Sequence, residues 1–388
     1  MNGMAIQKSP KHKFYGLDHL RALAIIMVFI FHYGHIFPHP EWTNTISNFG
    51  WTGVDLFFVL SGYLIASQLF AVIAATGTFS VKEFFIKRFF RILPAYFVVV
   101  ALYFLFPPLR EHEALAPLWK YLTFTQNIGL DLRTQGTFSH AWSLCVEEQF
   151  YLLFPLLLLF LLYCKALRKG AWLMLFLFLF GFAARLYSWY ALTTPHAGQD
   201  NFWVYWQEWM YYPTFCRLDG LLAGVSIAAL FQYLPKAKEW VQHRGNTFLI
   251  AGLVVETTAY FLCMNQQTFT ASIFGFPLVD FGYGLLVMGA ISPVTFLYKI
   301  SSRTTTKIAA LSFAIYLTHK IIIHQTQEQF AKLNVDKESN LMFLICIITC
   351  FCGALLMNKI VELPFLRWRD LLLRILEKSK GELVSARR

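Results

Sequence analysis

The sequence has 388 residues, of which 57% are hydrophobic and only 14% are charged. Its mean hydropathy of +0.51 lies outside the usual range of soluble globular domains, so the composition excludes a soluble enzyme and indicates an integral membrane protein. The net charge of +11 is not clustered on a predicted soluble surface. We therefore expect the lipid bilayer, and no nucleic acid, as a partner.

Long apolar runs recur along the chain, and a helix of about 20 residues crosses a hydrocarbon core of roughly 30 Å. Because these runs are continuous rather than alternating, they favour helices over a closed barrel. No small-residue cleavage site follows the first run, so we expect it to be retained. We predict an all-α, polytopic transmembrane bundle with ten spans, at residues 17–37, 52–73, 92–107, 141–163, 171–192, 213–231, 247–264, 276–298, 308–325 and 341–358.

The distribution of Lys and Arg predicts the orientation of the bundle. Six alternate segments, the two terminal ones included, hold 24 of these residues, whereas the five remaining loops hold 5. Since positive charge accumulates on the cytoplasmic side, we expect both termini to be cytoplasmic. We divide the chain into a membrane domain, 1–370, and a short basic tail, 371–388, that contacts lipid headgroups.

The cysteine positions and the longest outer loop each give a further prediction. Seven cysteines lie in or beside spans without paired spacing in an exposed loop, so we expect neither a disulfide framework nor a metal site. The loop 108–140 has an apolar stretch, Leu118–Ile128, that could dip toward the membrane. Its polar Gln126 and Asn127 would then need a wet cavity.

Ionisable side chains inside spans are costly, so each is a candidate functional group. Arg21 and His32 lie eleven positions apart in the first span, which puts them on one helix face, about 16 Å apart along the axis. With the N-terminus inside, Arg21 would lie near the cytoplasmic surface. His32 would then lie in the outer half of the membrane.

Three carboxylates are expected at a depth similar to that of His32. Glu147 and Glu148 fall about two turns below the outer surface in the fourth span, and Asp55 lies near the outer start of the second. A carboxylate beside a histidine orients the ring and stabilises its protonated form, as a general base requires. The structural alternative is an ion pair between Glu147 or Glu148 and Arg217.

A second cluster of charges lies on the opposite side. Lys87, Arg88 and Arg91 are flanked by phenylalanines, and such a cluster could bind phosphates. The alternative is an interfacial helix that obeys the positive-inside rule, but Arg21 at the same level favours the binding site. His319 and Lys320 lie mid-span, either as a buried polar pair or as part of a cavity.

Several sequence stretches, taken in order, resemble the acyltransferase family 3 membrane proteins, which include bacterial O-acetylases of surface glycans. The resemblance spans nearly the whole chain. It rests on GLDHLRALAIIMVFIFH at 16–32, GVDLFFVLSGYLI at 53–65, KRFFRILPAY at 87–96, FSHAWSLCVEEQFYLLFP at 138–155, RLDGLLAG at 217–224, SFAIYLTH at 312–319 and VELP at 361–364.

The resemblance implies a ten-helix enzyme of the bacterial cytoplasmic (inner) membrane that transfers an acyl group, most often acetyl from acetyl-CoA, to a hydroxyl of a glycan or lipid-linked sugar. It also implies that His32 is the essential histidine, with Glu147 in support. Arg21, Arg88 and Arg91 would hold the CoA phosphates.

The positions of other side chains in the predicted spans suggest further site residues, beyond those that the resemblance implies. Asp55 joins the catalytic group and Lys87 joins the donor-binding cations. Ser143, Tyr63 and Trp142 are candidate donors to the developing oxyanion.

Two other functions are compatible with intramembrane charge. A transporter of sugars or lipid-linked intermediates would also carry such residues, but we see no internal repeat, and the charged segments are concentrated before residue 155. A scaffold or receptor would have little need of them.

We expect the membrane domain to deliver acyl groups on the outer face without an appended hydrolase-like domain.

Overall fold

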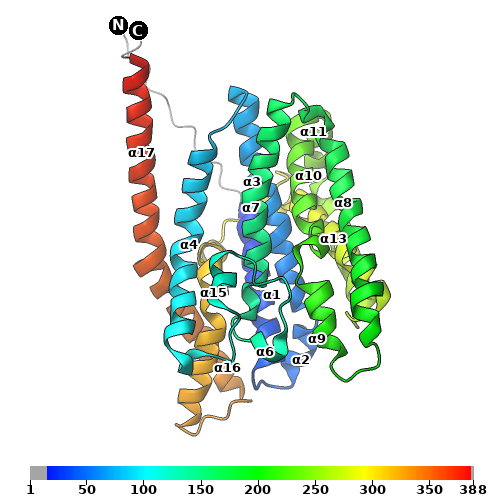
Figure 1. Cartoon of the computed structure of the whole chain (residues 1–388), viewed down its shortest axis with the longest axis vertical. Coiled ribbons are helices and arrows are strands. Elements are labelled where there is room, and N and C mark those ends of the chain that lie inside the picture. Colours follow the sequence, from blue (N-terminus) through cyan, green and yellow to red (C-terminus); the bar gives the residue numbers. More distant parts are fainter. Residues whose placement is uncertain (1–14, 386–388) are drawn as a thin grey trace.

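The computed structural model describes residues 15–385, and within this range the chain is helical and contains no β-strand (Figure 1). Among residues 15–385, nine helices are long and apolar enough to cross a membrane, or ten when a pair of helices bent by 110° counts as one span. The predicted polytopic bundle is therefore confirmed. The orientation of the termini stays a prediction, and most of the basic N-terminal segment and residues 386–388 lie outside the described residues.

Each predicted span corresponds to a helix. The two helices of the bent pair are α10 (Asp219–Tyr233) and α11 (Pro235–His243). The ten helices are α1 (Tyr15–Ile36), α3 (Gly53–Thr76), α4 (Val81–Leu105), α7 (Trp142–Tyr163), α8 (Gly170–Tyr187), α10 (Asp219–Tyr233), α12 (Gly245–Leu262), α13 (Phe276–Ala290), α15 (Arg303–Ala331) and α16 (Asn340–Met357).

Local sequence signals fix several helix ends. Ser80, Ser302 and Ser339 are N-caps whose hydroxyls accept a backbone N–H three residues on, at the starts of α4, α15 and α16. Gly77 ends α3 with a left-handed φ of 79°, a conformation that glycine adopts at little cost. These caps satisfy backbone groups that lipid would leave unpaired.

Glycines allow α3 to lie unusually close to its neighbours. A Cβ on Gly62 would lie 2.2 Å from the carbonyl oxygen of Leu221, and one on Gly224 would lie 2.2 Å from that of Val59. The backbones of α3 and α10 therefore touch, as small residues permit in membrane helices. This contact holds Asp55 and Ser61 of α3 at fixed positions in the centre of the bundle.

The long loop between α4 and α7 folds back into the protein, whereas the predicted dip of its apolar stretch toward the membrane stays a prediction. It includes α5 (Leu118–Leu122) and α6 (Leu132–Gln135), and its Phe138 is fully buried. The buried amide of Asn127 donates to the carbonyl of Tyr212 at 3.1 Å and to the Thr214 hydroxyl at 2.8 Å. Protein groups, rather than a wet cavity, thus satisfy this side chain.

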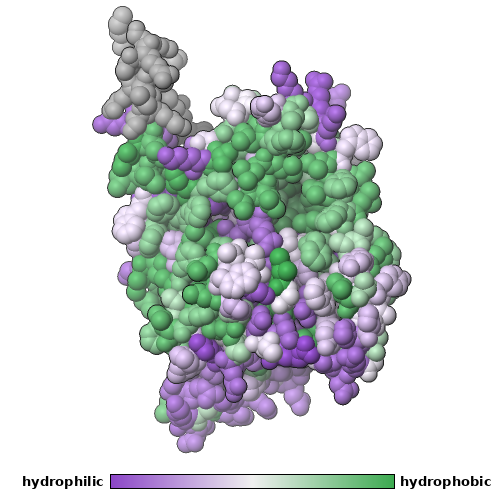
Figure 2. Space-filling view, in the orientation of Figure 1, coloured by the Kyte–Doolittle hydropathy of each residue, from purple (hydrophilic) through white to green (hydrophobic). Residues whose placement is uncertain are grey.

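The last helix crosses the predicted boundary between membrane domain and tail. A π-helical turn, Asn358–Glu362, joins α16 to α17 (Leu363–Ser385), and α17 lies alongside α4 (Figure 1). Figure 2 shows hydrophobic residues over most of one face, with hydrophilic residues gathered at the end that carries α2 (Trp42–Ser47) and α9 (Phe202–Trp206). This distribution matches a bundle surrounded by lipid.

Candidate active site

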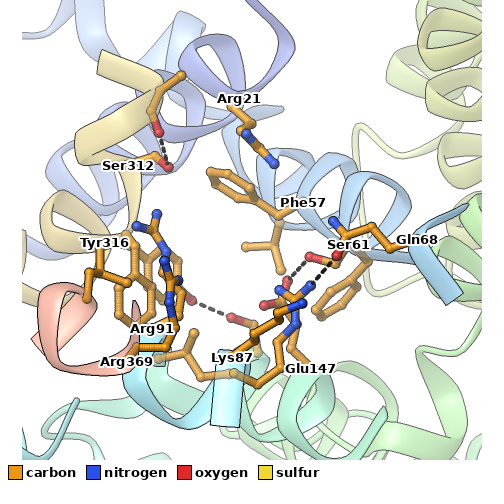
Figure 3. Close-up of a pocket in the computed structure, with 18 of the residues that line it drawn as sticks. Arg21, Phe57, Ser61, Gln68, Lys87, Arg91, Glu147, Ser312, Tyr316 and Arg369 are labelled. Atoms are coloured by element: carbon orange, nitrogen blue, oxygen red, sulfur yellow. Dashed lines mark hydrogen bonds between the residues drawn. The ribbon is translucent and has the colours of Figure 1, made fainter. Parts of the chain in front are cut away.

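A cavity of about 620 Å³ opens between α1, α3, α4, α7, α15 and α17 (Figure 3). Its size lies within the range of small-molecule sites. Apolar side chains, among them Phe57, Phe58 and Phe313, line part of its wall. The charged side chains that line it are Arg21, Lys87, Arg88, Arg91, Glu147, Arg369 and Asp370.

Basic side chains outnumber acidic ones in this lining, so the cavity favours an anionic ligand. All four donor-side cations predicted from the sequence are present. Arg88 lies over the Tyr151 ring, with 5.4 Å from its guanidinium carbon to the ring centroid, and its Nη2 is 3.5 Å from Gln68 Oε1. Arg21 has a long contact of 3.8 Å with Asp18. Neither guanidinium is locked in a tight carboxylate pair, so both are available to phosphate oxygens.

Glu147 belongs to this cavity and not to the surroundings of His32. Its carboxylate accepts hydrogen bonds from the Ser61 hydroxyl at 2.9 Å and from the Tyr151 hydroxyl at 3.1 Å. The expected equal depth of Glu147 and His32 did not allow for the folded-back loop that packs over the start of α7. Because that loop buries the start of α7, Glu147 lies deeper in the protein than a helix beginning at the surface would put it.

The inner end of the cavity is closed by a short chain of hydroxyl groups. Tyr316 donates to the carbonyl oxygen of His140 at 2.6 Å, so the 2.6 Å contact between Ser143 and Tyr316 has the serine as donor. Both hydroxyls line the cavity. Of the three oxyanion candidates, Ser143 is therefore at the site, whereas Tyr63 and Trp142 are not among the lining residues.

Beyond Tyr316 lies a buried cluster of three histidines, His32, His140 and His319. The Nδ1 atom of His32 is 2.9 Å from Nε2 of His319. The His140 ring lies 5.6 Å from that of His32 and 5.0 Å from that of His319, between centroids. Since Tyr316 packs against both His140 and His319, at 5.5 and 6.1 Å, one layer of side chains separates the cavity from the cluster.

Asp55 has a different partner from the one its depth suggested. Its carboxylate lies 2.5 Å from Nη2 of Arg217, and both side chains are buried. The guanidinium carbon of Arg217 is also 4.1 Å from the centroid of the Phe276 ring and 5.5 Å from that of Trp142. The structure thus corrects the partner in the alternative ion pair, which is Asp55 and neither Glu147 nor Glu148.

A second buried ion pair lies beside the histidine cluster. Glu111, in the folded-back loop, is 2.7 Å from Nζ of Lys320 and accepts the backbone N–H of Phe138 at 3.0 Å. Burial alone would raise the pKa of the Glu111 carboxyl, but the attraction and hydrogen bond of Lys320, together with backbone N–H donors, lower the pKa below its ordinary value. This pair fastens the loop to α15.

Sequence reasoning missed three residues at the site: His140, Tyr316 and Arg369. The α17 residues that line the cavity are Leu366, Arg369, Asp370 and Leu373, and this spacing of three and four residues along a helix face was the available signal. Among the described residues, the cysteines are free and no group of three or more His, Cys, Asp or Glu side chains could hold a metal ion.

Comparison with known proteins agrees with this architecture. A family model described as an acyltransferase domain matches residues 14–359. The O-acetyltransferases OatA of Staphylococcus aureus strains NCTC 8325 and COL are each 28% identical over 389 residues, which cover 95% of this chain and 59% of the relative. The chain thus spans about three fifths of the length of these curated relatives. No solved structure matches. From residue 14 to residue 359, the chain belongs to acyltransferase family 3.

Proposed function

We propose that this protein transfers an acyl group, most often acetyl from acetyl-CoA, to a hydroxyl of a surface glycan or lipid-linked sugar in the bacterial cytoplasmic membrane. The observation that carries this proposal is the cavity with an excess of basic side chains, which Tyr316 separates from the histidine cluster that contains His32. The O-acetyltransferase names of the relatives support the same reaction class.

The cavity suits an acyl-CoA because its lining combines basic side chains with an apolar wall. The phosphates of the donor would lie against Arg21, Arg88 and Arg91, since guanidinium groups bind phosphate oxygens in pairs of hydrogen bonds. The uncharged pantetheine arm would follow the apolar wall formed by Phe57 and Phe58. This arrangement brings the thioester to the inner end, beside Ser143 and Tyr316.

The reaction needs a base for the acceptor hydroxyl and donors for the oxyanion. Once the Tyr316 side chain moves from between the cavity and the cluster, neutral His32 takes the hydroxyl proton while the hydroxyl oxygen attacks the thioester carbonyl. The Ser143 hydroxyl, whose proton is then released from Tyr316, donates to the oxygen that gains charge. As the C–S bond breaks, the proton on His32 neutralises the departing CoA thiolate. A covalent acyl-histidine relay would use the same side chains.

A matched pair of histidine substitutions tests the proposal. Membranes that carry the native protein, His32→Gln or His35→Gln at equal protein level are given labelled acetyl-CoA, and both CoA release and label in the glycan fraction are measured. His35 lies on the same helix, is exposed, and contacts Phe31 through a hydrogen bond to its carbonyl and through its ring. We expect His32→Gln to lower transfer by about 10² to 10⁴-fold and His35→Gln to leave it unchanged.

The outcomes separate the candidate functions. Label retained in His32→Gln would mean that another residue is the base. Absence of both CoA release and label in native membranes would contradict acyl transfer from acetyl-CoA. Uptake of labelled sugar intermediates by the native protein without acetylation would favour the transporter.

A further inference from the structure

The hydrogen bonds of His319 determine which of its ring nitrogens carries a proton. Its Nδ1 lies 3.0 Å from the carbonyl oxygen of Ile315 and 2.9 Å from that of Tyr316. A carbonyl oxygen only accepts hydrogen bonds, so Nδ1 is the protonated nitrogen. A positive His319 beside the buried Lys320 ammonium would be costly. The ring is therefore neutral, and its Nε2 carries a lone pair.

The protonation of His319 also determines which nitrogen of His32 carries a proton. Nε2 of His319 and Nδ1 of His32 are 2.9 Å apart, and since Nε2 is the acceptor, Nδ1 of His32 must donate. Neutral His32 then has no proton on Nε2, its other nitrogen. No described residue forms a hydrogen bond to that Nε2. Two backbone carbonyls of α15 thus set the protonation of a side chain on α1.

We propose that His319 is a positioning residue for His32, which it holds with Nε2 as a free lone pair for the acceptor hydroxyl. This inference rests on the proposed acyl transfer and adds the residue that fixes the tautomer of the base. His319 takes the place that the sequence suggested for a carboxylate. When His32 gains a proton on Nε2, its Nδ1–H still donates to the lone pair of His319, which stabilises the imidazolium without a negative charge beside the thioester.

Two substitutions of equal chain length separate positioning from packing. His319→Gln retains an oxygen that accepts from His32 Nδ1–H, whereas His319→Met fills similar space without a comparable acceptor. We expect His319→Met to lower kcat by about 100-fold or more, and His319→Gln to retain kcat within about tenfold of the native protein. KM for acetyl-CoA should stay within about threefold in both, because the donor-side cations are unchanged.

Equal loss of kcat in the two variants would overturn the proposal and leave His319 as a packing residue, as would full activity in both. Thermal unfolding of each variant in detergent shows whether the fold is retained. If neither variant folds, ring nitrogen shifts in the native protein decide. Solid-state NMR of ¹⁵N-histidine-labelled protein in lipid should show a neutral His32 protonated on Nδ1, assigned by its loss in His32→Gln.

A His32 signal protonated on Nε2 would overturn the inference whatever the activity. Absence of acetyl transfer by the native protein would instead count against the proposed function, while the NMR measurement would still decide the tautomer. The two proposals can therefore fail separately.

Discussion

The cavity and the histidine cluster are neighbours, yet their charged side chains differ in how tightly they are paired. In the cavity, arginines such as Arg21 and Arg88 have only long or weak polar contacts. Around the cluster, Lys320 is closed into a buried pair with Glu111, and His32 is held by His319. Charges without a tight partner are available to a ligand, whereas charges paired in the interior hold side chains in place.

Because of this difference in pairing, substitution of a charged side chain should have different effects in the two regions. Loss of a buried partner leaves an uncompensated charge and should destabilise the fold. Loss of a cavity cation should leave the fold intact and weaken donor binding. The following substitutions test this division, from the largest expected effect to the smallest.

Asp55→Asn should produce the largest loss of stability. It leaves the Arg217 guanidinium buried without its carboxylate, at a cost of about 3–5 kcal/mol. Thermal unfolding in detergent measures the effect. Lys87→Gln is the matched control, because its ion pair with Glu83 is exposed and worth about 0–1 kcal/mol. Similar unfolding temperatures for the two variants would contradict a structural role for Asp55.

Glu111→Gln should lower stability in a pH-dependent manner. The pKa of Glu111 is lowered in the folded protein, so its stabilising contribution is complete above the ordinary glutamate pKa of about 4.3 and is lost as the pH falls through the folded-state value. Near pH 7 we expect a loss of about 3 kcal/mol. The difference from the native protein should shrink in acid, and a difference independent of pH would argue against the ion pair.

Arg88→Gln should raise KM for acetyl-CoA by about tenfold and leave kcat nearly unchanged, because one charge-assisted contact to the donor is lost. Kinetics with acetyl-CoA and with acetyl-dephospho-CoA measure whether the contact is to the ribose phosphate. A variant that loses kcat but not donor affinity would place Arg88 in the chemical step.

Glu147→Gln tests whether this carboxylate acts on the donor side or on the histidine. Its contacts are Ser61 and Tyr151 in the cavity, so we expect KM for acetyl-CoA to change by about fivefold with no shift in the pH dependence of kcat. A shifted pH profile would restore the supporting role for His32 that the sequence suggested.

Arg369→Gln should have the smallest effect, a rise of about threefold in KM, because the Arg369 guanidinium already bonds to Asp370. Asp370→Asn is the informative companion, since release of the arginine should lower KM. No change in either variant would mean that α17 forms the cavity wall without contacting the donor.

Much of the fold was predictable because lipid imposes a simple rule on sequence. An apolar run of sufficient length must become a helix, so the ten spans follow from composition. Arg21, Lys87, Arg88 and Arg91 were also correctly grouped in one cavity, because each lies at or just before the start of a predicted span on the same predicted side. Their role in binding the donor stays a prediction.

Pairing within the interior was not predictable in the same way. Depth along a helix places Asp55, Glu147 and His32 at approximate levels, but only helix packing and the folded-back loop decide which side chains meet. Asp55 pairs with Arg217, and Glu147 accepts hydrogen bonds from Ser61 and Tyr151. The side chain beside His32 is His319 of α15.

The sequence by itself determined that this protein is a polytopic membrane helix bundle, which residues could carry charge inside it, and which family it resembles. The tertiary structure decided which of those charges pair with one another and which line the cavity. The physical reason is that burial in lipid depends on the composition of each segment, whereas a hydrogen bond such as that between His32 and His319 requires atoms from distant segments to lie within about 3 Å.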